Sequence, residues 1–200
     1  MKIVCIGRNY GAHAKELGNA IPEEPVVFLK PLSALIPNSG PIKLPAFSHD
    51  VHHEIELVYR IERTPHGAEA AGVTIGLDLT ARDVQQRLKE QGLPWEKAKA
   101  FDASAYVASE FIAVKDLGDR QQTFQLKRNG TVVQEGHNGQ MIFDVPTLIA
   151  CVERYMRLET GDLFFTGTPA GVGHLAPGDR LEGYLLDELR FDLLVEGPTA

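Results

Sequence analysis

The feature that most restricts the fold is a pair of segments in which hydrophobic and polar side chains alternate. Residues 52–61 place an apolar side chain at every second position, and residues 73–80 repeat this period. A period of two puts neighbouring side chains on opposite faces of a β-strand. Glu54 and Glu56 therefore share one strand face, and Asp78 lies on the small polar face of the second strand.

The rest of the chain indicates many short strands and three helices, separated by turns that 12 Pro and 19 Gly supply. Asn129-Gly130 between two apolar runs is the strongest hairpin signal, and Asp187-Glu188 is expected to join the last two strands. Further strands are predicted at residues 2–6, 26–29, 123–128, 131–135, 163–166, 181–186 and 189–195. Helices are predicted at residues 10–17, from a capping box of Thr80 and Asp83 through Leu88, and after Asp144 as N-cap. With no repeat, low-complexity tract or linker, this pattern favours one α+β domain that is mostly β.

Charge and composition limit the partners. The chain has 20 basic and 27 acidic side chains, a net charge of −7, and no cluster of Lys and Arg. It therefore offers little that would bind a nucleic acid or an anionic membrane, and a small-molecule partner is expected.

The apolar run at residues 3–6 is too short for a signal peptide, and no run approaches a membrane span. Cys5 and Cys151 lie far apart in sequence, which favours a reducing compartment, the cytoplasm.

The carboxylates on the alternating strands are candidate metal ligands. The Cα atoms of Glu54 and Glu56 should lie about 6.6 to 7 Å apart, which lets both side chains reach one cation above the sheet. If the strand of Asp78 pairs nearby, a third carboxylate joins them, and an all-oxygen set favours Mg²⁺ or Mn²⁺, with Ca²⁺ possible, over Zn²⁺ or copper. The alternative is that two glutamates on an outward face are simply solvated.

Histidines raise two further hypotheses. His49, His52 and His53 lie beside the acidic pair, but no Cys is close and adjacent strand residues point apart, so zinc is disfavoured and a supporting role for one histidine is favoured. His13 and Glu16 share one face of the first predicted helix, where Glu16 can orient the imidazole as a general base. A solvated surface pair is the alternative.

Missing motifs exclude other enzyme classes. The glycine-rich segment 166–173 lacks the ending of a phosphate-binding loop and the order of a dinucleotide site. The chain also contains no GxSxG elbow and no HExxH motif. A nucleotide cofactor, a serine hydrolase and a zinc protease of these types are therefore not expected.

Six motifs, taken in order, resemble the fumarylacetoacetate hydrolase superfamily along nearly the whole chain. They are Gly7-Arg8-Asn9-Tyr10 with His13 and Glu16, residues 53–57, residues 77–83, Pro94-Trp95 through Phe101, residues 141–143, and residues 167–173. The likeness is closest to short single-domain members: acylpyruvate hydrolases, oxaloacetate decarboxylases and related isomerases of aromatic catabolism. It implies a mixed β-sandwich roll with a few short helices, one catalytic domain over residues 1–200, a lid near residues 11–25, and a homodimer.

The same resemblance implies roles for individual residues. It implies a divalent ion, Mg²⁺ or Mn²⁺, held by Glu54, Glu56 and Asp78. The implied catalytic residues are His13 with Glu16, as a water-activating dyad, and Lys99; the implied substrate-binding residues are Arg82, Gln85 and Thr168. Lys99 and Arg82 would meet substrate oxygens, and Gln85 and Thr168 would hold the substrate carboxylate. The sequence departs from many members at Ala100, where Ser or Gly is common after the lysine.

The expected function is that of a Mg²⁺- or Mn²⁺-dependent hydrolase that cleaves a C–C bond in acylpyruvate-type 2-oxo acids through a metal-bound enolate. The alternative is an oxaloacetate decarboxylase or an isomerase of unsaturated 2-oxo diacids, since all these reactions use the same stabilised enolate. A non-catalytic domain that binds Ca²⁺ for structure is the third hypothesis.

Overall fold

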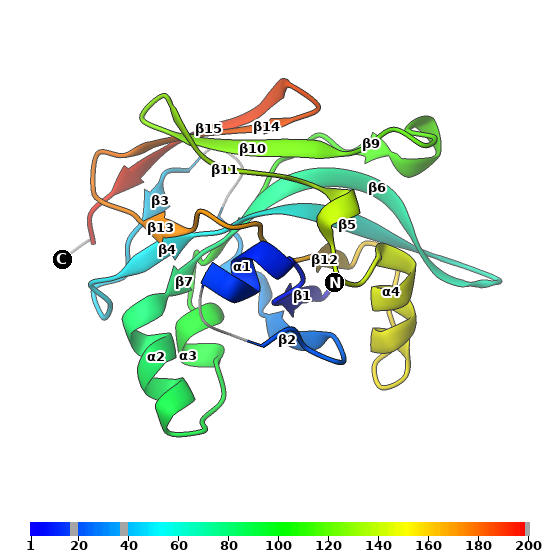
Figure 1. Ribbon diagram of the computed structural model, residues 1–200, viewed down its shortest axis with the longest axis horizontal. Helices are drawn as coiled ribbons and strands as arrows, with labels where there is room; N and C mark the ends of the chain where they lie inside the picture. The colour runs from blue at the N-terminus through cyan, green and yellow to red at the C-terminus, as the bar shows by residue number, and fades with distance from the viewer. Residues whose placement is uncertain (17–19, 37–39, 199–200) are drawn as a thin grey trace.

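The computed structural model describes residues 1–16, 20–36 and 40–198, and in these ranges the strands form three sheets (Figure 1). The largest has the order β2-β1-β12-β5-β6-β8, with β9 on β6; the second has the order β11-β10-β14-β15-β3, and the third the order β13-β4-β7. A few short helices lie around them, so the expected fold, a mostly β roll, is confirmed. None of the described helices is long and apolar enough to cross a membrane.

The large sheet forms the centre of the molecule. Its strands are β1 (Ile3–Gly7), β2 (Val26–Lys30), β5 (Ile55–Thr64), β6 (Gly67–Asp78), β8 (Ala105–Val107), β9 (Ile112–Ala113) and β12 (Leu163–Phe165). β5 and β6 form the longest antiparallel pair, and β1 runs parallel to β12. Buried apolar side chains cover both faces: one cluster includes Leu57 and Ile75, and another includes Val58 and Phe165.

The second sheet lies above the large one in Figure 1. Its strands are β3 (Ile42–Lys43), β10 (Thr123–Arg128), β11 (Thr131–His137), β14 (Arg180–Leu185) and β15 (Glu188–Glu196). The predicted hairpin is confirmed, with Asn129 and Gly130 at φ 53° and 80°. The turn between β14 and β15 was misplaced by one residue. The turn is formed by Leu186 and Asp187, at φ 53° and 67°. A two-residue turn that follows the twist of its strands requires such positive φ values.

The predicted strand over residues 52–61 is broken at Glu54. β4 (Val51–His53) pairs with β7 (Thr80–Ala81) and β13 (Gly173–His174), whereas β5 continues in the large sheet. The neighbouring strand changes sheets at the same level, where β6 ends at Asp78 and β7 begins at Thr80. The backbone N–H of Asp78 donates to the Glu54 carbonyl at 2.9 Å, which fixes the two breaks side by side.

The helices flank the sheets. They are α1 (Gly11–Glu16), α2 (Arg82–Glu90), α3 (Glu96–Lys99) and α4 (Val145–Glu153). Asp144 caps α4 as predicted, because its carboxylate accepts the backbone N–H of Thr147 at 2.9 Å. The capping box at Thr80 is wrong: Ala81 is the N-cap of α2 and makes no side-chain cap bond. Thr80 instead donates its hydroxyl to Glu54, since it lies in β7 and faces the acidic side chains.

Asp162 fastens the first strand to the sheet. Its carboxylate is 0% exposed and accepts the Lys2 ammonium at 2.7 Å and the backbone N–H groups of Lys2 and Glu159 at 2.6 and 2.9 Å. Burial raises the pKa of Asp162, but these donors outweigh burial and the net pKa is lowered. The folded protein therefore stabilises the ionised carboxylate of Asp162.

We expect Asp162→Asn to lower the free energy of unfolding by about 2 kcal/mol at pH 7, because a charged acceptor of several donors is lost. A lowered pKa contributes stability above the unfolded value of about 3.9 and loses it as pH falls below that value. The deficit of the variant should thus shrink at pH 3. Urea denaturation at both pH values measures it. Asp119→Asn, at an exposed position, is the control, and an equal deficit at both pH values would contradict the assignment.

Candidate active site

Three carboxylates meet where the two central strands change sheets. Ligand oxygens of Glu54, Glu56 and Asp78 all lie within 4.8 Å of one another, and the three residues are 5%, 1% and 1% exposed. Glu54 stands at the break between β4 and β5, Glu56 within β5, and Asp78 at the end of β6. The alternative of solvated glutamates is wrong, because β5 lies inside the large sheet and its Glu-bearing face is covered.

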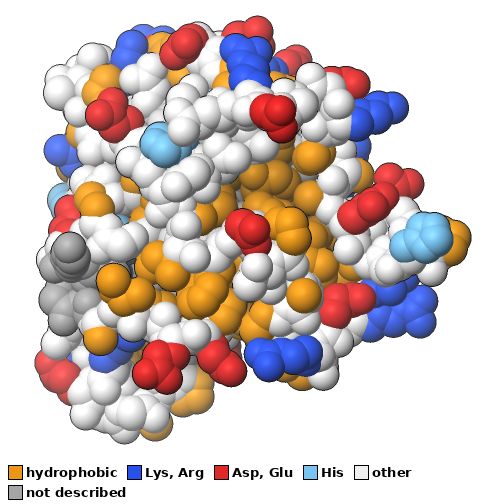
Figure 2. Space-filling view, turned by 45° about the vertical axis from the view of Figure 1, so that its right-hand side comes forward, with side chains coloured by type: hydrophobic (Ala, Val, Ile, Leu, Met, Phe, Trp, Pro, Cys, Tyr) orange, Lys and Arg blue, Asp and Glu red, His pale blue; other side chains and the backbone are white. Residues whose placement is uncertain are grey.

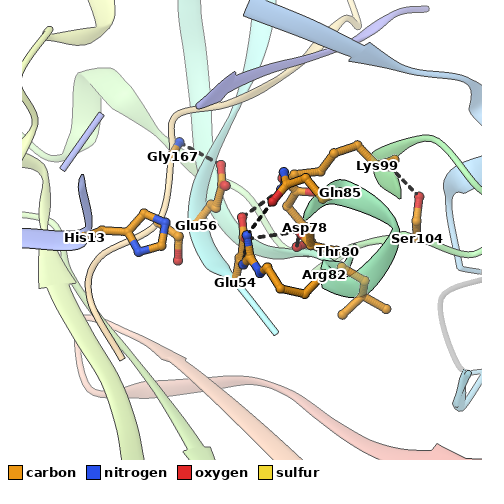
Figure 3. A network of polar contacts seen from close by, with 12 residues as sticks. His13, Glu54, Glu56, Asp78, Thr80, Arg82, Gln85, Lys99, Ser104 and Gly167 are labelled. Carbon is orange, nitrogen blue, oxygen red and sulfur yellow. Dashed lines mark hydrogen bonds and ion pairs between the residues drawn. The ribbon is translucent and has the colours of Figure 1, made fainter. Parts of the chain in front are cut away.

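Three cations surround these acids. The Lys99 ammonium bridges Glu54 Oε2 at 2.8 Å and Asp78 Oδ2 at 2.6 Å. Arg82 Nη2 donates to Glu54 Oε1 at 2.5 Å. On the side away from the cavity, the buried ammonium of Lys30 lies 2.8 Å from Asp78 Oδ1. Figure 3 shows His13 approaching the acidic cluster from one side and Lys99 and Arg82 from the other.

The electrostatics separate the two glutamates. Burial raises the pKa of Glu54, but the charges of Lys99 and Arg82 outweigh burial and hold this pKa well below its usual range. Burial raises the pKa of Glu56 well above its usual range, and the charges of Asp78 and Glu54 add to the effect. Burial lowers the pKa of Lys99, but the charges of Asp78 and Glu54 outweigh burial and raise the pKa above its usual value, so the side chain stays an ammonium. Glu56 thus has too little positive charge beside it to stabilise its ionised carboxylate at this buried position.

A backbone donor orients Glu56. Gly167 N–H donates to Glu56 Oε2 at 2.7 Å, and Gly167 adopts φ 96°, a left-handed conformation that favours glycine. A Cβ at this position would lie 2.9 Å from the Asn9 Cβ. The motif 167–173 therefore uses its first glycine to direct a backbone N–H at an acidic side chain.

The residues present fit a divalent cation. The donor set is three carboxylates with no sulfur or nitrogen, which suits Mg²⁺ or Mn²⁺. The ammonium of Lys99 already lies between Glu54 and Asp78 as a positive charge. Burial and the charges of Asp78 and Glu54 raise the pKa of Glu56, so a further positive charge beside Glu56 would stabilise its ionised form. These observations support a site for a hard divalent cation.

The first helix brings His13 and Glu16 together over the acids. His13 is 5% exposed, and its Nδ1 lies 3.0 Å from Glu16 Oε2. The second carboxylate oxygen of Glu16 accepts the backbone N–H of Gly171 at 3.0 Å, which ties α1 to the loop after β12. The bond at Nδ1 leaves Nε2 of His13 free for another partner. Of the expected lid near residues 11–25, residues 17–19 lie outside the described residues.

Gln85 and Thr168 line the same cavity, with different bonding capacity. Gln85 Oε1 accepts Arg82 Nη1 at 2.8 Å, so its amide N–H₂ remains available. The Thr168 hydroxyl donates to the Ile55 carbonyl at 2.7 Å and accepts Gln134 Nε2 at 2.8 Å. The hydroxyl proton of Thr168 is therefore already used, and its backbone N–H makes no hydrogen bond within the described residues.

The histidines beside Glu54 do not form a zinc site. His53 Nδ1 bonds Gln134 Oε1 at 2.8 Å, whereas His52 Nε2 bonds Asp50 at 2.9 Å, so the two rings have different partners. Burial lowers the pKa of His53 to about 4, despite the opposing bond from Gln134, so its ring is neutral. Among the described residues, the only group with metal-ligand spacing is the three carboxylates.

Two buried residues of the site were missed by sequence reasoning. Lys30 ends β2, where a lysine is typical of a solvated strand end. Gln134 lies in β11, and its amide accepts from His53 and Ile55 N–H and donates to Thr168 and the Pro169 carbonyl. It thereby joins the second sheet to the strands that carry the acids. No spacing in the sequence indicates either contact.

A small cavity of about 30 Å³ lies among these groups. Its lining residues are Ile6, Gly7, Arg8, His13, Phe28, Glu54, Glu56, Asp78, Arg82, Gln85, Lys89, Trp95, Lys99 and Thr168. Every site residue predicted from the sequence except Glu16 lines this cavity, and Glu16 reaches it through His13.

An acidic triad at the junction of two sheets, with a histidine dyad above it, defines the class of site. Residues 2–189 match the family model described as "Fumarylacetoacetate (FAA) hydrolase C-terminal". The chain belongs to the fumarylacetoacetate hydrolase family.

Relatives with different activities resemble the chain. It is 45% identical over 188 residues to the oxaloacetate tautomerase YcgM of Escherichia coli K12, covering 90% of this chain and 86% of that protein. It is 42% identical over 208 residues to a mitochondrial oxaloacetate decarboxylase of Dictyostelium discoideum, covering 97% and 94%. A crystal structure of fumarylpyruvate hydrolase from Pseudomonas aeruginosa, in complex with Mn²⁺ and pyruvate, superposes with a TM-score of 0.88 at 35% identity and covers 98% of this chain and 89% of that one.

Proposed function

We propose that this chain is a divalent-metal-dependent enzyme that interconverts the keto and enol forms of oxaloacetate-type 2-oxo acids. The observation that carries the proposal is the pairing of an acidic triad with a free imidazole nitrogen across one small cavity. Relatives of similar length are an oxaloacetate tautomerase and an oxaloacetate decarboxylase, which supports the alternative function above more than C–C bond hydrolysis.

The ligands in this proposal are Glu54, Glu56 and Asp78, which would hold Mg²⁺ or Mn²⁺. When bound, the metal supplies Lewis acidity that polarises a 2-oxo group. Lys99 and Arg82 add positive charge on the same side, where the enolate oxygen becomes negative. Fixed charges of this kind contribute about 3 kcal/mol each to transition-state stabilisation.

Proton transfer is assigned to His13. Its Nε2 is the free nitrogen, because Glu16 accepts the proton on Nδ1 and fixes that tautomer. His13 removes a proton from C3 of the keto acid while the C2 oxygen takes up a proton from solvent to give the enol, and in the reverse direction His13 returns a proton to C3 as the C2 oxygen releases one to solvent. The substrate carboxylate is bound by the free amide N–H₂ of Gln85 and by the backbone N–H of Thr168, since the Thr168 hydroxyl is committed to Ile55.

Hydrolysis is the second candidate. The similar structure that contains Mn²⁺ and pyruvate is a fumarylpyruvate hydrolase. In that reaction His13 would take a proton from water, the water oxygen would attack the distal carbonyl, and the C3–C4 bond would break. Decarboxylation uses the same electron acceptor and needs no activated water.

The test compares three reactions with added Mg²⁺ or Mn²⁺: tautomerisation of oxaloacetate, decarboxylation of oxaloacetate and cleavage of acetylpyruvate. We expect the wild-type protein to accelerate enol–keto conversion of oxaloacetate, followed by the ultraviolet absorbance of the enol. His13→Ala should lower this rate by about 10² to 10⁴, which is the usual contribution of a general base. CO₂ release from oxaloacetate should survive better in this variant, because it needs no base.

The outcomes separate the candidates. Rapid cleavage of acetylpyruvate without any effect on the oxaloacetate tautomers would replace this proposal with the hydrolase. Equal loss of tautomerisation and decarboxylation in His13→Ala would contradict the role of His13. His66→Ala, at an exposed turn, is the matched control and should leave all rates unchanged.

We also propose a homodimer in the cytoplasm and a lid formed by residues 11–25 of a single catalytic domain. Figure 2 supports an association surface, because hydrophobic side chains gather across the middle of one face, with most charged side chains towards its edges.

Cys5 and Cys151 are both free in the described residues, in keeping with a reducing compartment. The contact of Glu16 with Gly171 supports a closable segment.

A further inference from the structure

Four cationic side chains line the cavity, and two of them have no acidic partner. Arg82 and Lys99 bond the acidic triad. Arg8 and Lys89 line the same cavity, yet neither side chain makes a hydrogen bond or an ion pair with any described residue. Residues 17–19, 37–39 and 199–200 contain no acidic side chain. Unpaired cations at the wall of a binding cavity attract an anion.

Arg8 is held at this position at a conformational cost. Its φ is 61°, a left-handed conformation that is unfavourable for an arginine because its Cβ lies close to the following carbonyl oxygen. The next residue, Asn9, is 1% exposed and keeps the turn in place. Its side chain donates to the carbonyls of Phe143 and Thr166 and accepts the Phe143 N–H at 2.8 Å. Such strain persists where the surroundings enforce it, commonly at binding sites.

Lys89 comes from the helix that carries the proposed substrate-binding residues. Arg82, Gln85 and Lys89 are separated by three and four positions in α2, so they share one helix face. Burial lowers the pKa of Lys89, and the charges of Arg82, Arg8 and Lys99 lower it further. These cations thus act on one another, and a bound anion would relieve their repulsion.

Trp95 brings the two unpaired cations together. The Arg8 guanidinium carbon lies 5.9 Å, and the Lys89 Nζ 5.7 Å, from the centre of the Trp95 ring. Both contacts are in the range of cation–π interactions. An aromatic ring attracts the cations without neutralising their charge, so both remain able to bind a carboxylate.

We propose that Arg8 and Lys89 form a second anion subsite that binds the distal carboxylate of a short 2-oxo diacid and so selects diacids over 2-oxo monoacids. This rests on the proposed function, in which the triad and Gln85 hold the 2-oxo acid head. In oxaloacetate, the diacid of the proposed function, the second carboxylate carbon (C4) lies only two bonds from the 2-oxo carbon (C2). It therefore reaches the wall of the same small cavity.

A larger cleft beside the site offers the competing specificity. It has a volume of about 740 Å³, shares Phe28, Trp95 and Lys99 with the cavity, and is otherwise lined mostly by apolar residues such as Val26 and Leu93. An apolar acyl chain would fit there. A preference for monoacids with long apolar chains would therefore assign specificity to the cleft rather than to Arg8 and Lys89.

The experiment measures hydrogen–deuterium exchange at C3 of oxaloacetate and of pyruvate by NMR in D₂O with Mg²⁺, with the uncatalysed rate subtracted. The readout is the ratio of kcat/KM for the diacid to that for the monoacid. We expect Arg8→Met and Lys89→Met each to lower this ratio by about 10-fold or more, as for the loss of a hydrogen bond to a charged group. The loss should come from a higher KM for oxaloacetate.

Three further variants serve as controls for this test. Arg87→Met changes an exposed arginine of the same helix and should leave the ratio unchanged. Arg8→Gly removes the side chain and relieves the left-handed strain, so its melting temperature should not fall while the ratio falls as in Arg8→Met. Lys89→Arg should restore most of the ratio lost in Lys89→Met.

The outcomes are distinct. An unchanged ratio in both Arg8→Met and Lys89→Met, or equal losses for oxaloacetate and pyruvate, would overturn the subsite. A ratio that falls in Arg87→Met as well would also overturn it, because a general loss of surface charge would then explain the effect. Absence of exchange on both substrates in the wild-type protein would instead refute the proposed function.

Discussion

Glu56→Gln is expected to abolish metal binding and turnover while the metal-free protein stays folded. The amide keeps the size of the side chain but removes the negative charge that a hard cation requires. Changing groups that only support metal ligands costs 10- to 100-fold, so loss of a ligand itself should lower metal affinity and kcat by at least about 100-fold. Folding should be little affected, because Glu56 is a buried acid beside two others and its pKa is raised by burial and by their charges.

Calorimetric titration with Mn²⁺, thermal unfolding without metal, and the oxaloacetate assay test this together. Glu62→Gln, at an exposed position of the same strand, is the matched control and should behave as wild type. A variant that still binds Mn²⁺ would contradict the assignment of Glu56. A large fall in melting temperature, with no activity in the wild-type protein, would support the structural Ca²⁺ hypothesis instead.

The strands of this fold could be predicted from the sequence better than their partners could. The alternation over residues 52–61 correctly indicated a strand with two acids on one face, and Asn129-Gly130 correctly indicated a hairpin. An alternating pattern indicates which face of a strand each side chain occupies, but it does not indicate which strand lies beside it. The break at Glu54, where the chain passes from one sheet to another, therefore carried no signal.

The site shows the same division between local and long-range information. Glu54 and Glu56 are close in sequence, as are His13 and Glu16, so their shared faces follow from strand and helix geometry. Asp78 joined them because adjacent antiparallel strands pair. Lys30 and Gln134 reach the site from a separate edge strand and from a separate sheet, so only the assembled fold places them.

Lys30 completes the balance of charge around the acids. Glu54, Glu56 and Asp78 carry three acidic groups, and Lys30, Lys99 and Arg82 bring three cations within ion-pair distance of two of them. Lys99 and Arg82 face the cavity, but Lys30 does not line it. Its ammonium instead contacts the Ser104 carbonyl and hydroxyl at 3.0 Å each, and the carbonyl of Lys99. Lys30 thus fixes the positions of Asp78 and of the helix of Lys99 from the side away from the cavity.

Lys30→Met is therefore expected to lower the free energy of unfolding by about 3 to 5 kcal/mol, the usual cost of removing one partner of a buried ion pair. Lys30 is 3% exposed and Asp78 1%, so water cannot replace the lost cation. Urea denaturation without metal measures the loss, and Lys97→Met, at an exposed position of α3, is the control. Added Mg²⁺ should raise the melting temperature of Lys30→Met more than that of the wild type, because a second cation then neutralises Asp78. A loss below about 1 kcal/mol would mean that Lys99 alone compensates the Asp78 charge.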